Sequence, residues 1–110
     1  MPRGFGGGGG MGDLVRQAQK MQQRMAEVQS GLKERIVEGT AGGNMVRVFV
    51  NGQQEIVGVK IDPQVIDPKD PAMLEDLILA ASRQGLKKSR EMAQEEMNRV
   101  TGGANVPGMF

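Results

Sequence analysis

The chain has 110 residues, with 14 Lys and Arg against 13 Asp and Glu, and it contains neither His nor Cys. Without cysteine there is no disulfide framework, no thiol nucleophile and no cysteine-type zinc site, and without histidine the commonest general base and metal ligand is missing. The carboxylates form no recognisable catalytic motif, so we expect no enzyme, no cofactor, no metal site and no small-molecule substrate.

Size and apolar composition favour one domain that buries part of its core against a second copy. The chain has three Phe, no Trp, no Tyr and nine Met. A core of this size that is poor in aromatic residues and rich in flexible Met is hard to make self-sufficient. We therefore expect a homodimer. No apolar run is long enough for a membrane span and no secretory signal is evident, so we expect a cytoplasmic protein without a membrane partner.

Charge is distributed unevenly along the chain, although the net charge is only +1. Residues 1–35 carry a net charge of +3, residues 36–80 carry −4 and residues 81–110 carry +2. Basic ends around an acidic middle are a mild indication of a polyanionic partner.

Residues 1–12 are mostly glycine and predict a disordered leader ahead of one domain at 13–100. Asp13 is a good N-cap for a helix that ends between Ser30 and Lys33. The apolar residues of this helix are spaced alternately four and three apart, a heptad seam that requires another helix beside it. They are Leu14, Ala18, Met21, Met25, Val28 and Leu32.

A row of cations lies on another side of the same helix. Arg16, Lys20 and Arg24 are spaced four residues apart and therefore stack along one face, with glutamines between them. A solvated helix face is one interpretation. The other is a row of contacts to DNA phosphates, for which long cationic side chains and amide donors are suited.

Three antiparallel strands are predicted next, at residues 34–40 and in a hairpin at 45–61. Apolar residues alternate in both hairpin strands, and Asn51-Gly52 predicts a two-residue type I′ turn between them. Gly58 indicates a bulge. The residues expected to pack, or to form a subunit contact, are Val46, Val48, Phe49, Val50, Val57, Val59 and Ile61.

A second helix is predicted from Asp70-Pro71 to Val100. At about 45 Å it is longer than the sheet, so its second half is expected to project and pair with the first helix as an arm. Residues 101–110 predict a flexible tail. Four cations on the second helix are expected on the same arm as the first row: Arg83, Lys87, Lys88 and Arg90.

In this order, the elements resemble the YbaB/EbfC family of bacterial nucleoid-associated proteins. The resemblance rests on QAQKMQQRM (17–25), VRVFVNG (46–52), VKIDP (59–63), MLEDLILAA (73–81) and the closing GG…VPGMF. It implies an α+β fold of order α-β-β-β-α, with a three-stranded antiparallel sheet, long flanking helices that form a projecting arm, and a homodimer. It also implies DNA binding in the nucleoid, with effects on DNA shape and gene expression.

We interpret the chain as a dimeric protein that binds double-stranded DNA through phosphate contacts and alters its conformation. The chief alternative is a protein–protein interaction module that uses the Met-rich helix seam and binds no DNA. We rank an enzyme low because the sequence indicates neither a pocket nor a pair of titratable residues for catalysis. We rank a peripheral membrane role last because the chain has no Trp or Tyr to anchor it at a bilayer surface.

Overall fold

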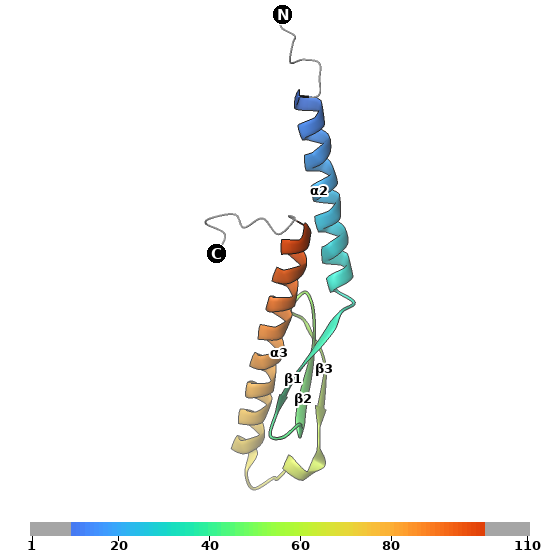
Figure 1. Cartoon of the computed structure of the whole chain (residues 1–110). Coiled ribbons are helices and arrows are strands. Elements are labelled where there is room, and N and C mark those ends of the chain that lie inside the picture. Colours follow the sequence, from blue (N-terminus) through green and yellow to red (C-terminus); the bar gives the residue numbers. More distant parts are fainter. Residues whose placement is uncertain (1–9, 101–110) are drawn as a thin grey trace, which may run out of the picture.

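The computed structural model describes residues 10–100, which form an elongated α+β fold measuring 82 × 25 × 16 Å (Figure 1). The predicted order α-β-β-β-α is confirmed. The elements are α2 (Gly10–Leu32), β1 (Ile36–Ala41), β2 (Val46–Asn51), β3 (Ile56–Ile61), a 3₁₀ turn (Pro63–Val65) and α3 (Pro71–Val100). The predicted leader and tail fall largely outside the described residues.

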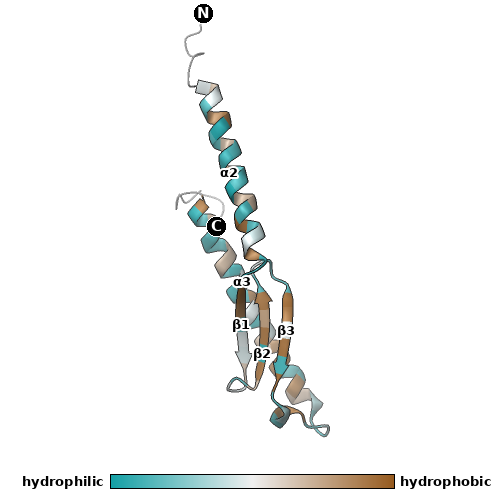
Figure 2. Cartoon of the chain, turned by 90° about the vertical axis from the view of Figure 1, so that its right-hand side faces the viewer, coloured by the Kyte–Doolittle hydropathy of each residue, from teal (hydrophilic) through white to brown (hydrophobic). Residues whose placement is uncertain are grey.

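The three strands form one antiparallel sheet in the order β1-β2-β3. Val48 at the centre of β2 pairs with Gly39 on one side and Val59 on the other. Helix α3 packs on β1 and β2, and beneath it Val46, Val48 and Val50 are completely buried, as predicted. Figure 2 shows how apolar residues dominate β2 and β3.

The connection between β2 and β3 is longer than the predicted two-residue turn. Gly52 to Glu55 separate the strands, and the positive φ angle of 61° belongs to Gln54. The Asn51 side-chain oxygen Oδ1 accepts hydrogen bonds from the backbone N–H groups of Gln53 at 2.9 Å and Glu55 at 3.0 Å. The type I′ prediction is therefore wrong, because Asn51 organises the longer loop through its side chain.

Gly52 is needed for close approach rather than for an unusual φ angle. A Cβ atom at Gly52 would lie 2.6 Å from the carbonyl oxygen of Leu32, the last residue of α2. The Gly52 N–H donates to that same oxygen at 2.8 Å. This contact anchors the end of α2 on the hairpin loop.

A bulge lies beside Gly58, as predicted. Phe49 pairs with Gly58 and Val50 pairs with Ile56, so Val57 is an extra residue without a counterpart. The expected alternation of Val57, Val59 and Ile61 is therefore interrupted, and Ile56 rather than Val57 lies opposite Val50.

Helix α3 approaches β1 closely along one edge of the sheet. The Thr40 N–H donates to Gln84 Oε1 at 2.7 Å, and Lys88 Nζ donates to the Glu38 carbonyl at 3.0 Å. These two side chains occupy backbone groups of β1 that a further strand would otherwise use. Side chains of α3 thus occupy part of the β1 edge.

Helix α2 begins at Gly10, earlier than the predicted start at Asp13. Asp13 therefore lies in the first turn, where its carboxylate interacts with Arg16 instead of capping the helix. Residues 10–24 are all exposed, and we call them the arm. The arm extends past the C-terminal end of α3 (Figure 1).

Candidate nucleic-acid interface

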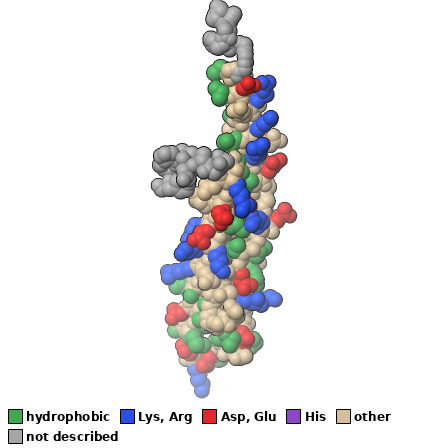
Figure 3. All heavy atoms as spheres, viewed as in Figure 1, with side chains coloured by type: hydrophobic (Ala, Val, Ile, Leu, Met, Phe, Trp, Pro, Cys, Tyr) green, Lys and Arg blue, Asp and Glu red, His purple; other side chains and the backbone are tan. Residues whose placement is uncertain are grey.

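The arm carries the first predicted row of cations. Arg16, Lys20 and Arg24 follow one another at four-residue intervals, about 6 Å apart along the helix axis. Arg16 interacts with Asp13, whereas Lys20 and Arg24 have no ion pair among residues 10–100. Figure 3 shows cationic side chains in a line along one side of the arm.

The second predicted group lies over the sheet and not on the arm. Gln84, Gly85 and Lys88 all contact β1, and the Ser89 hydroxyl donates to the Asn51 carbonyl of β2. The segment that carries Arg83, Lys87, Lys88 and Arg90 therefore runs along the sheet. The expectation that both groups share one arm is wrong. The charged composition of α3 beyond Gly85 predicted that this part would project past the sheet, but residues 84–89 still pack on β1 and β2.

Within this second group the four side chains are not equivalent. Lys88 is held against the β1 edge by its bond to the Glu38 carbonyl. Arg83, Lys87 and Arg90 are exposed and make no ion pair among the described residues. They add a second patch of positive charge, separate from the arm.

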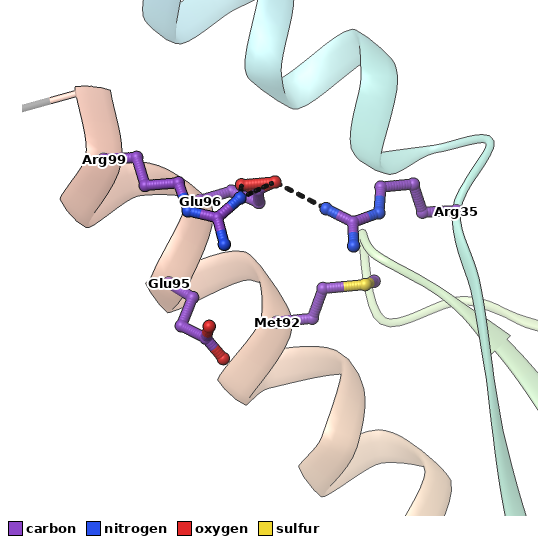
Figure 4. A pocket seen from close by; sticks show the side chains of 5 residues that line it. All are labelled: Arg35, Met92, Glu95, Glu96 and Arg99. Carbon is purple, nitrogen blue, oxygen red and sulfur yellow. Dashed lines mark hydrogen bonds and ion pairs between the residues drawn. The ribbon is translucent and has the colours of Figure 1, made fainter.

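A charged cluster fixes the base of the arm (Figure 4). Arg35 Nη1 lies 2.6 Å from Glu96 Oε1, and Arg99 Nη1 lies 2.9 Å from Glu96 Oε2. The Glu96 side chain is only 19% exposed, with Met92 beside it. Because Arg35 directly precedes β1, this carboxylate ties the segment after α2 to the C-terminal turns of α3.

Sequence reasoning missed the role of Arg35 and Glu96. They are 61 residues apart, so no local spacing connects them. Only the Glu96–Arg99 spacing of three residues within α3 gives a sequence signal. Arg35 and Arg99 are thereby partly neutralised, which leaves Lys20 and Arg24 as the more available cations at this end of the molecule.

The sheet face opposite α3 carries a mixed polar and aromatic surface. Arg47 pairs with Glu38 at 3.5 Å, and its guanidinium lies 5.8 Å from the centre of the Phe49 ring. Phe49, which was predicted to make a subunit contact, is half-buried beneath this arginine. The stacking accounts for an aromatic residue on a face that α3 does not cover.

Residues 10–100 offer neither a metal-binding cluster nor a helix that could span a membrane. No group of three or more His, Cys, Asp or Glu side chains is placed to hold a metal ion there. Neither helix in this part of the chain is long and apolar enough to cross a lipid bilayer.

Comparison with known proteins gives consistent results. The profile of the YbaB/EbfC DNA-binding family matches residues 7–104. A nucleoid-associated protein of Clostridium kluyveri is 50% identical over 106 residues, which are 96% of this chain and 93% of the relative. A nucleoid-associated protein of Caldanaerobacter subterraneus is 45% identical over 107 residues, covering 97% and 96%.

A solved structure supports the fold independently. An uncharacterized protein of Helicobacter pylori superposes with a TM-score of 0.74 at 22% identity, covering 86% of this chain and 100% of that one. Together with the family profile and the two close relatives, this establishes the resemblance noted in the sequence. The chain belongs to the YbaB/EbfC DNA-binding family.

Proposed function

We propose that this protein binds double-stranded DNA in the nucleoid as a homodimer, chiefly through phosphate contacts, and changes the path of the duplex. Family membership supports DNA as the partner, and the names of its relatives support the nucleoid. The arm is the observation that supports phosphate contacts. It is an exposed helix with a row of cations, and two of them, Lys20 and Arg24, have no ion-pair partner among the described residues.

The separation of the two cationic groups supports a change in DNA path. One group lies on the arm and the other on α3 beside the sheet. We infer that a duplex held by both groups of each subunit is bent, and bending a short site by tens of degrees costs on the order of 1–6 kcal/mol. Phosphate contacts on a dimer are a source of the free energy that offsets this cost.

The dimer contact that we propose is an apolar corner between β3 and α3. A single helix covers β1 and β2 but scarcely reaches β3. Ile56 and Val59, which lie on the same sheet face as the buried Val50 and Val48, therefore stay 49% and 48% exposed. Leu79, on the side of α3 away from the β1 edge, is 49% exposed. We call Ile56, Val59 and Leu79 the β3 corner.

Charging the β3 corner is expected to separate the subunits. The double variant Val59→Lys, Leu79→Lys places two cations where a second copy would pack, and burying an unpaired charge is strongly unfavourable. Sedimentation equilibrium should show a monomer at concentrations where the unaltered protein is a dimer. Ile36→Lys is the control, because Ile36 is 50% exposed on the opposite sheet face. A corner variant that stays dimeric would exclude this surface.

DNA binding itself is tested by fluorescence anisotropy of a labelled 30-base-pair duplex at several salt concentrations. If about six to eight phosphate contacts form per dimer, log K should fall against log salt with a slope near −5 to −7. Unlabelled DNA of another sequence should displace the probe. Absence of binding at low salt would refute the proposal and favour a protein–protein interaction module.

A further inference from the structure

The arm has a second surface, an apolar stripe on the side away from the cations. At about 100° per residue, Leu14, Ala18 and Met21 fall within about 60° of one another, and the row from Arg16 to Arg24 lies in the opposite half of the helix circumference. The large apolar residues of the stripe are strongly exposed. Their exposed fractions are 73% for Met11, 62% for Leu14, 51% for Val15 and 43% for Met21.

The rest of residues 10–100 leaves this stripe uncovered. Helix α3 ends at Val100, which lies beside Arg24, Glu27 and Val28 of α2. The heptad seam is accordingly buried at Leu32, half-buried at Val28 and Met25, and exposed from Met21 back to the N-terminus of the helix. A helix of about 15 residues is marginally stable in water unless it packs on something. Among the described residues, the exposed part of the seam thus continues an existing helix–helix contact but has no partner helix.

Apart from Leu14, whose mirror position is Gln22, the apolar residues of the stripe are arranged symmetrically about Ala18. Met11 and Met25 stand seven residues to either side of it, and Val15 and Met21 stand three residues to either side. Two such helices running antiparallel, with a two-fold axis at Ala18, place each Met11 opposite Met25 of the second copy. The small Ala18 lets the helix axes approach, and flexible Met side chains fill the space around it.

Charge does not oppose this pairing. In the same register Arg24 lies opposite Gly12 of the second copy. Arg16 lies opposite Lys20, but both are about 160° around the helix from Ala18 and therefore lie on the side away from the contact. Lys20 and Arg16 remain on the outer sides of the helix pair and stay accessible to phosphates. Pairing and DNA binding therefore use different faces of the same arm.

We propose that the arms of two chains pair antiparallel through this stripe, with Ala18 at the two-fold axis, and so join one dimer to the next. The pairing itself needs no DNA, and only its consequence for DNA rests on the proposed function. A chain with two distinct two-fold contacts, the β3 corner and the stripe, assembles into an extended row or a closed ring of copies. A row of dimers links DNA segments that a single dimer cannot reach.

Cross-linking tests the register directly, because the natural chain has no cysteine. Ala18→Cys should form disulfide-linked pairs under mild oxidation without DNA, roughly tenfold or more faster than Gln23→Cys, because neighbouring thiols have a high effective concentration. Gln23 lies on the far side of the helix and is also exposed. Equal rates for the two variants, as expected if another segment or another protein covers the stripe, would overturn the proposal.

Sedimentation velocity then distinguishes this contact from the dimer contact. The unaltered protein should grow beyond a dimer as its concentration rises, whereas Leu14→Gln with Met21→Gln should stop at the dimer and still bind a short duplex. Glutamine keeps the helix propensity of both positions. A variant that becomes monomeric, or an unaltered protein that never exceeds a dimer, would contradict the proposal. Cross-linking at Ala18 without DNA binding would refute the proposed function alone.

Discussion

Reversing Lys20 and Arg24 together to Glu is expected to weaken DNA binding about 100-fold or more at 0.1 M salt. The two residues are the arm cations without ion-pair partners, whereas Arg16 already interacts with Asp13. Each phosphate contact contributes about 0.9 to the salt slope, so a dimer that loses four contacts should show a slope shallower by about 3 to 4. Anisotropy titrations at three or more salt concentrations measure both quantities.

The control for this variant has the same change in net charge at another place. Lys60→Glu with Lys69→Glu reverses two exposed lysines, one on β3 and one in the connection before α3. It should lower the affinity far less, because neither residue belongs to the arm or to the second cationic group. Equal losses in both variants would mean that only net charge matters. An unchanged affinity in the arm variant would transfer the DNA contacts to α3.

The fold was largely predictable because its signals are local. Period-two apolar residues define β2, and Asp70-Pro71 marks the start of α3, where the Asp70 carboxylate accepts the Met73 N–H at 3.3 Å. The β2–β3 loop was not predictable in the same way. Asn51-Gly52 suits a tight turn, yet the glycine is required by the approach of Leu32, a contact between residues 20 positions apart.

In the candidate site, only those positions could be predicted that depend on residue spacing within one helix and on nothing else. The row from Arg16 to Arg24 follows from a four-residue interval on an exposed helix. The position of Arg83 to Arg90 depends instead on how far α3 follows the sheet, and this is set by the packing of Gly85 against Gly39. The uncovered β3 corner likewise depends on α3 lying toward β1, which no pattern within α3 reveals.

Gly39→Ala is expected to destabilise the protein by about 3 kcal/mol or more, the largest effect of any single substitution considered. A Cβ at Gly39 would lie 2.1 Å from the Ala81 carbonyl oxygen and 2.4 Å from the Gly85 nitrogen. Both are backbone atoms of α3, so no side-chain rotation relieves the overlap, and the helix has to move off the sheet. Val46, Val48 and Val50 would then lose their cover.

Gly31→Ala provides the matched control, because a Cβ there meets nothing within 4 Å. Alanine within a helix should raise stability by about 0.5–1 kcal/mol. Urea unfolding followed by circular dichroism, at one fixed protein concentration, measures both variants on the same scale. If Gly39→Ala unfolded at the same urea concentration as the unaltered protein, the close contact between β1 and α3 would be refuted, and with it the reason that α3 leaves β3 exposed.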